Sequence, residues 1–193
     1  KQGKDGVDKK PKQLKAEKRV AFETLVREYE KPLLRYAVRL LRDQDAAQDV
    51  VQNTFLRFLS GWKEAWVPSP QLSSWLYRVA HNCAVDYIRK ESRRRALHEK
   101  QSKEIPVTVD PNRGEAFRIS DEAVQAADAL GTLSERDQQL VILKIYEEKS
   151  YKEISTIAGL TITNVGYILH HAMKKLAVEL TRLKETPNDG PTS

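Results

Sequence analysis

Apolar residues in the first half of the chain recur at the spacing of one helix face, in four successive runs. Pro32 separates the first two runs, because proline suits the first turn of a helix. The third run begins near Asp45, whose carboxylate suits an N-cap or first-turn position. The pattern predicts a compact helical bundle over residues 20–97. The runs are Phe22, Leu25, Val26 and Tyr29; Leu33, Ala37, Leu40 and Leu41; Val51, Phe55, Phe58 and Leu59; and Trp75, Leu76, Val79, Ala80, Cys83, Ala84, Tyr87 and Ile88.

A second helical unit is predicted over residues 121–185. The periodicity stops at about Glu99 and returns at about Asp121, and the stretch "IPVTVDPNRG" between them carries two Pro and one Gly. We therefore expect a flexible linker over residues 98–120. Ser134, with Asp137 three residues later, indicates a helix start. The expected fold is all-α, with two small helical domains joined by this linker.

The end of the second unit has the pattern of a helix-turn-helix. A short helix with Ile154, Ile157 and Ala158 facing inward is followed by Gly159 in a turn and by Thr161, which can cap the next helix. A plain helical hairpin is the alternative. The inward residues expected on the long second helix are Ile162, Val165, Leu169, Ala172 and Leu176.

Composition adds a weak indication of a polyanionic partner. Lys and Arg number 33 against 27 Asp and Glu, a net charge of +6. A single cysteine, Cys83, excludes a disulfide framework, and we expect it to be a buried core thiol. No apolar run reaches the length of a signal or membrane-spanning segment, so we expect a cytoplasmic protein without membrane insertion. The polar ends, residues 1–19 and 186–193, are expected to be disordered tails.

Catalysis is not expected from this sequence. It has no glycine loop that would cradle a phosphate and no nucleophile elbow, and its carboxylates lie at helix starts or on charged faces. The pair His170 and His171 lacks Cys, Asp or Glu at ligand spacing on its face. We therefore expect no enzyme activity, no cofactor and no metal.

Three stretches of the chain resemble one known family. In order and spacing, "DAAQDVVQNTFLRFL", "SSWLYRVAHNCAVDYIRK" and "LSERDQQLVILKIYEEKSYKEISTIAGLTITNVGYILHHAMKKL" resemble regions 2 and 4 of the extracytoplasmic-function (ECF) sigma factors of bacterial RNA polymerase. The resemblance covers residues 20–97 and 121–183. It implies that region 2 docks on the clamp helices of core polymerase and melts the minus-ten element. It implies that region 4 sits on the flap and reads the minus-thirty-five element of promoter DNA, and it suggests an anti-sigma protein as a further partner.

The resemblance also assigns roles to particular residues of region 2. For polymerase docking it favours the polar face of the third helix; without the resemblance this would be read as a solvated face. For single-stranded minus-ten DNA it favours loop tryptophans for stacking, an asparagine at the pocket position and cations for the backbone. Packing beneath the loop is the alternative for the tryptophans. The docking residues are Asp45, Gln48, Asp49, Gln52 and Asn53; the minus-ten residues are Trp62, Trp66, Arg78, Asn82, Arg89, Lys90, Arg93 and Arg94, with Arg95 nearby.

The helix that would read the minus-thirty-five element departs from the family pattern. The family commonly has Thr-Val-Lys-Ser-Arg-Leu-His-Arg-Ala-Arg, and four of its cationic positions are here Gly166, Ile168, His171 and Met173. Losing several phosphate contacts should weaken the grip on DNA. The helix can read DNA with less electrostatic help, be held there by polymerase, or present an apolar patch to a protein. The residues expected on its exposed face are Thr163, Asn164, Tyr167, His170 or His171, Lys174 and Lys175.

Two other functions compete with that of a working sigma factor. A sigma-like decoy that sequesters an anti-sigma protein is favoured by the missing cations, and is opposed by the loop tryptophans and the basic helix of region 2. An ordinary helix-turn-helix repressor should dimerise and bind duplex DNA alone, and the polar docking strip argues against it. We expect a sigma factor that directs promoter recognition, strand melting and transcription initiation at a specialised regulon.

Overall fold

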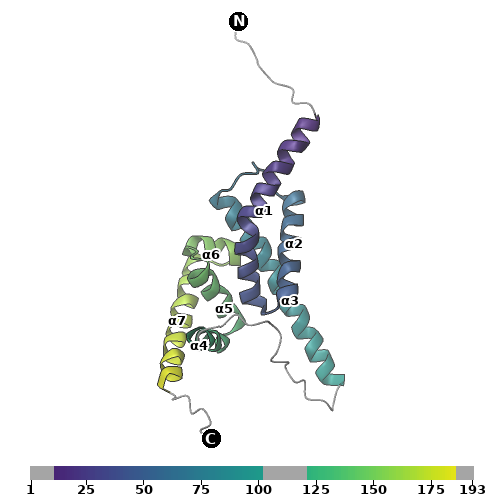
Figure 1. The fold of residues 1–193 in the computed structure, drawn as a ribbon. Coiled ribbons are helices and arrows are strands. Elements are labelled where there is room, and N and C mark those ends of the chain that lie inside the picture. Colours follow the sequence, from purple (N-terminus) through teal and green to yellow (C-terminus); the bar gives the residue numbers. More distant parts are fainter. Residues whose placement is uncertain (1–10, 102–120, 186–193) are drawn as a thin grey trace. The chain divides into compact units, whose positions relative to one another are not determined.

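The computed structural model describes residues 11–101 and 121–185, with side chains over 16–97 and 125–183, and every regular element in these ranges is a helix. The chain divides into two compact units, residues 1–84 and 85–193, with the boundary inside the helix Pro70–Gln101. Each unit is described by itself (Figure 1). The helices are α1 (Pro11–Leu41), α2 (Gln44–Gly61), α3 (Pro70–Gln101), α4 (Asp121–Gly131), α5 (Glu135–Val141), the π-helix η1 (Ile142–Tyr146), α6 (Tyr151–Ala158) and α7 (Ile162–Glu185).

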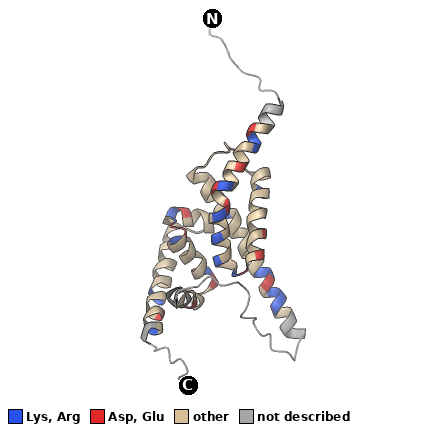
Figure 2. Cartoon of the chain, in the orientation of Figure 1, with Lys and Arg blue, Asp and Glu red and all other residues tan. Residues whose placement is uncertain are grey.

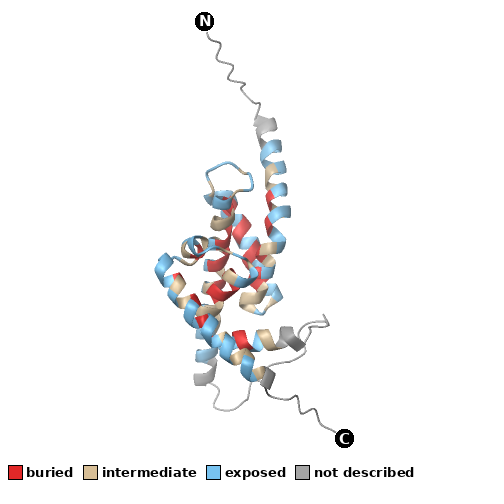
Figure 3. Ribbon diagram, turned by 90° about the vertical axis from the view of Figure 1, so that its left-hand side faces the viewer, coloured by how far each residue is buried: buried red, intermediate tan, exposed pale blue. Residues whose placement is uncertain are grey.

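In the first unit, α1 and α2 form an antiparallel hairpin, joined by a turn at Arg42 and Asp43. Arg42 has a positive φ of 53°, and the Asp43 carboxylate accepts a hydrogen bond from the Ala46 amide at 3.1 Å. Asp43 is thus the N-cap of α2, and Asp45 lies in its first turn. Figure 3 shows the buried faces in red. The core includes Leu25, Leu33, Tyr36, Ala37, Val51, Phe55, Phe58, Leu72, Leu76, Ala80 and Ala84.

The prediction of two helices separated at Pro32 was wrong. α1 continues through Pro32, although a proline inside a helix removes one backbone hydrogen bond and crowds the preceding turn. Leu25, Tyr29, Leu33 and Ala37 are buried along one face across the proline, so tertiary packing outweighs the local cost. α1 also begins at Pro11, so the expectation of a disordered tail was wrong for residues 11–19; residues 1–10 and 186–193 lie outside the described residues.

Some residues expected in the core lie at its margin. Leu59 of α2 is 44% exposed and Ile162 of α7 is 52% exposed, so both inward assignments were wrong. Tyr87 of α3 is also exposed, and Cys83 is half-buried rather than a core residue. Leu59 lies in the last turn of α2, and Ile162 is the first residue of α7.

In the second unit, α7 packs against α4, α5 and α6. The Ser134 hydroxyl accepts from the Asp137 amide at 3.2 Å, which confirms the predicted start of α5. α6 starts with a full capping box, Ser150 with Glu153, which the S-x-x-E spacing could have predicted. The hydrogen bond from the Ser150 side chain lowers the pKa of the Glu153 carboxyl.

The turn between α6 and α7 is the predicted one. Gly159 has φ 66°, in the left-handed region that favours glycine. The Thr161 hydroxyl accepts from the Asn164 amide at 3.2 Å and so caps α7. Ile154, Ile157 and Val165 are buried, as are Leu169 and Ala172.

A π-helix was not foreseen between α5 and α6. The Glu147 amide donates to the Ile142 carbonyl, five residues back, at 3.2 Å. This wider turn ends the helix before α6 begins.

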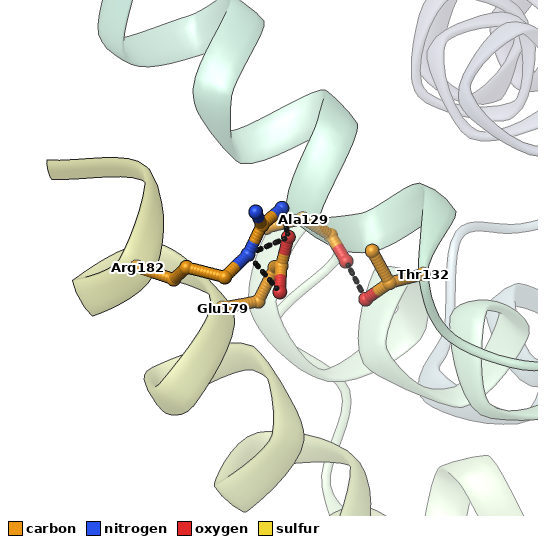
Figure 4. A network of polar contacts seen from close by, with 4 residues as sticks. All are labelled: Ala129, Thr132, Glu179 and Arg182. Carbon is orange, nitrogen blue, oxygen red and sulfur yellow. Dashed lines mark hydrogen bonds and ion pairs between the residues drawn. The ribbon is translucent and has the colours of Figure 1, made fainter. Parts of the chain in front are cut away.

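An ion pair on α7 lies beside the end of α4. Figure 4 shows Arg182 donating to Glu179 with, next to them, the Thr132 hydroxyl donating to the Ala129 carbonyl at 2.8 Å. Each of these bonds joins residues of one segment, Glu179 with Arg182 in α7 and Thr132 with Ala129 at the end of α4. No described helix is both long enough and apolar enough to cross a membrane.

Candidate nucleic-acid interface

The polar strip predicted on α2 is exposed along its whole length. Asp45, Gln48, Asp49, Gln52 and Asn53 all face solvent, at the i, i+3, i+4, i+7 and i+8 spacing of one helix face. Beside the strip is an open groove of about 510 Å³ between α1 and α2. Its lining combines side chains of the strip with apolar ones from both helices. The lining residues are Phe22, Glu30, Leu34, Gln48, Asp49, Val51, Gln52, Phe55, Leu56 and Leu59.

The two loop tryptophans are part of an aromatic cluster. The Trp62 ring lies 5.6 Å from that of Trp75 and 6.5 Å from that of Phe58, between ring centroids. The Trp66 ring lies 5.0 Å from that of Phe58. Both indoles are half-buried and make the contacts expected of packing beneath the loop, the alternative left open for them. Aromatic rings bury much apolar area when they pack edge to face, and this favours packing over exposure.

The asparagine and all the cations predicted for minus-ten DNA lie exposed on α3. Arg78, Asn82, Arg89 and Arg93 fall within about 60° of one another around the axis, at 100° per residue. Glu91 binds Arg94 at 2.8 Å and Arg95 at 3.5 Å, and its pKa is lowered chiefly by the Arg94 hydrogen bond. Figure 2 shows blue Lys and Arg residues along the C-terminal half of α3. The exposed stripe therefore does not include the two arginines that pair with Glu91.

The predicted outer face of α7 is also exposed. Thr163, Asn164, Tyr167, His171, Lys174 and Lys175 all face solvent, and His170 joins them. The Tyr167 and His171 rings are 4.3 Å apart, so they form one aromatic surface on this face. The exposed face of α7 thus carries hydrogen-bonding and aromatic groups, followed by Lys174 and Lys175.

Sequence reasoning missed one buried polar pair in the first unit. The Tyr36 hydroxyl and His81 Nδ1 lie 2.8 Å apart and share a hydrogen bond. Burial lowers the pKa of His81 to about 4, so the ring is neutral at neutral pH. A histidine at an inward helix position, next to Asn82, was the available signal.

Two family models match the chain. Sigma-70 region 2 matches residues 25–94, and sigma-70 region 4 matches residues 123–176. The ECF RNA polymerase sigma factor SigL of Mycobacterium tuberculosis is 30% identical over 157 residues, covering 80% of this chain and 85% of SigL. This chain belongs to the ECF sigma factor family.

Further relatives agree with this assignment. The RNA polymerase sigma factor YlaC of Bacillus subtilis is 25% identical to this sigma factor over 169 residues, covering 86% of this chain and 96% of YlaC. The sigma factor RpoE of Bartonella quintana, solved with the anti-sigma factor NepR, has the same fold, with a TM-score of 0.62 and 22% identity over 83% of this chain and 96% of that one. The resemblance inferred from the sequence is confirmed, and the decoy and repressor alternatives are not favoured.

Proposed function

We propose that this sigma factor docks on core RNA polymerase through α2 and carries it to a specialised set of promoters. The exposed polar strip beside an apolar groove is the observation that supports this. Amphipathic helices bind in apolar grooves, and the amide and carboxylate groups along the rim can fix the register of a partner helix. Leu56 and Leu59, exposed at the groove, would be covered by that partner.

The minus-ten element would be captured by the α2–α3 loop and the exposed stripe of α3. Asn82 can pair with the edge of a flipped base, and Arg78, Arg89 and Arg93 can bind the phosphates around it. Lys90 and Arg94 lie next to this stripe. The polymerase would supply the chemistry, and this chain would supply binding and strand separation.

The minus-thirty-five element would be read by the outer face of α7. Asn164 can pair bidentately with adenine, and Thr163 and Tyr167 can contact phosphates or a thymine methyl. His171 and the two lysines, Lys174 and Lys175, lie farther along the helix. Because Lys and Arg are absent from Ile162 to Met173, base readout here would proceed with little charge.

An anti-sigma protein is a further proposed partner. The Bartonella quintana relative was solved with an anti-sigma factor. Such a protein could cover the α2 groove or the exposed apolar residues of α7, and would thereby compete with polymerase or DNA.

The docking proposal is tested by binding of the purified chain to core polymerase. We expect Asp49→Ala with Gln52→Ala to weaken core binding by about tenfold, as the loss of two interfacial hydrogen bonds would. Arg57→Ala, an exposed change on α2 outside the strip, should leave it unchanged. Failure of the unmodified chain to bind core polymerase would overturn the proposal.

A further inference from the structure

The α2–α3 loop, residues 62–69, is held at its start by Trp62. The Trp62 amide donates to the Phe58 carbonyl at 3.1 Å and ends α2. The indole Nε1–H donates to the Ala65 carbonyl at 3.2 Å, and so closes the loop on itself. Its ring lies against Phe58 and Trp75. Because the Nε1–H is used and the ring is half-buried, Trp62 supports the loop from beneath.

The middle of the loop is held by α1. Trp66 packs against Phe58 of α2, and its ring centroid lies 6.3 Å from that of Phe22 on α1. The Lys18 ammonium sits over the same indole, 5.8 Å from the ring centroid, within range of a cation–π interaction. Trp66 is therefore enclosed by side chains from two helices that do not belong to the loop.

The end of the loop is tied to α1 as well. The Ser69 hydroxyl accepts from the Leu72 amide at 3.1 Å and caps α3. Burial raises the pKa of the Tyr29 hydroxyl, and a hydrogen bond from the Ser69 backbone opposes that rise. α1 thus contacts the loop at two separate points.

Only the tip of the loop is free to meet a partner. The exposed loop residues are Lys63, Glu64 and Ala65, which stand between the two supported indoles, and Val67 and Pro68, which follow Trp66. A loop that is ordered before it binds loses less conformational entropy on binding. The arrangement therefore suits a rigid tip presented to a single strand.

We propose that Phe22 of α1 is a positioning residue for promoter reading: it fixes Trp66 and thereby holds the tip, rather than the indole faces, toward the melted strand. This inference rests on the proposed function. Phe22 contacts Phe55, Phe58 and Trp66. Removing its ring frees Trp66 on one side while the loop sequence stays unchanged.

The first test is hydrogen–deuterium exchange of the 62–69 amides in the isolated chain. We expect Phe22→Ala to speed this exchange by about tenfold, Phe22→Leu to have a smaller effect, and Lys18→Ala to act in the same direction. The matched control is Val20→Ala on the same helix, because Val20 is 62% exposed. Unchanged exchange in Phe22→Ala, in protein that melts like the control, would overturn the proposal.

The second test compares transcription initiation on promoters that carry either the recognised minus-ten sequence or an altered one. Binding to core polymerase is measured in parallel. Because Phe22 also lines the α2 groove, initiation is expressed per bound polymerase. We expect Phe22→Ala and Lys18→Ala to lose several-fold in minus-ten discrimination. Lost core binding with discrimination intact would overturn the positioning role, whereas failure of the unmodified chain to initiate at all would count against the proposed function itself.

Discussion

At the scale of single residues, the surroundings of a side chain decide its exposure and its pKa, as the histidines show. His170 and His171 are exposed on α7, whereas His81 is 6% exposed and bonded to Tyr36. Burial disfavours the charged imidazolium and lowers the pKa of His81 from 6.5 to about 4. His81 is thus a core residue whose protonation opposes folding.

Acid should therefore destabilise the first unit through His81. Between pH 4 and 6.5 the unfolded chain binds the proton and the folded chain does not, so the stabilisation is complete above the unfolded pKa and is lost as pH falls. We expect this residue to lower the free energy of unfolding by about 2 kcal/mol between about pH 7.5 and about pH 5. Urea denaturation followed by circular dichroism at the two pH values measures it.

The control for this prediction is His81→Gln, which can still bond to the Tyr36 hydroxyl but does not titrate. Its stability should fall about 2 kcal/mol less than that of the unmodified protein over the same pH range. Parallel pH curves for the two proteins would show that His81 is not the titrating group.

Gly166 shows a residue choice that packing does not explain. A Cβ at this position would lie 3.6 Å from Cε2 of Tyr151, an ordinary contact distance. Glycine inside a helix costs about 1 kcal/mol relative to alanine. Nothing in the structure of α7 requires glycine there.

At the scale of elements, the cations of α7 lie in its C-terminal half. Lys and Arg are absent from Ile162 to Met173, and the exposed Lys174 and Lys175 follow directly. Recognition helices enter the major groove by their N-terminal residues, so if α7 reads DNA as proposed, the lysines would meet the phosphates at the edge of the groove. The electrostatic part of α7 binding should therefore come from these two residues.

The salt dependence of DNA binding tests this distribution of charge. We expect Lys174→Ala with Lys175→Ala to make the plot of log binding constant against log salt shallower by about 2. His171→Arg with Met173→Arg, which restores two family cations, should steepen it by a similar amount. Fluorescence anisotropy with labelled duplex DNA gives these slopes.

Val178→Ala, an exposed apolar change on the same helix, is the control for this series and should leave the slope unchanged. If removing both lysines had no effect on the slope, α7 would not face the phosphates as proposed.

Local signals predicted the helices and their caps well. Ser134, Gly159 and Thr161 act within one turn of the chain, so residue type and spacing suffice to place them. Pro32 misled because burial on both sides of it outweighs its local cost. The π-helix η1 was missed because its wider turn depends on the packing around it rather than on a local residue signal.

In the candidate site, too, features set by local sequence were predicted and features set by long-range packing were not. The exposed faces of α2 and α7 were predicted, since helical periodicity alone decides which side chains share a face. The packing around Trp62 and Trp66 was not predicted, because the rings that contact them come from α1, α2 and α3. Contacts between residues far apart in sequence leave no local pattern.

At the scale of the whole molecule, the proposed function gives the two matched regions separate tasks. Region 2 would dock and melt, and region 4 would hold the upstream element, so both must act on one promoter. The predicted linker falls largely outside the described residues, and the domain limits 20–97 and 121–185 stay a prediction.

Transcription by core polymerase with this protein on genomic DNA, with start sites mapped, tests the central claim most directly. We expect discrete start sites that share a minus-ten element and an upstream element. Asn82→Ala should abolish most starts, and Tyr167→Ala should weaken those with the strongest upstream element. Initiation no different from core polymerase alone, despite binding of the protein to it, would contradict the account.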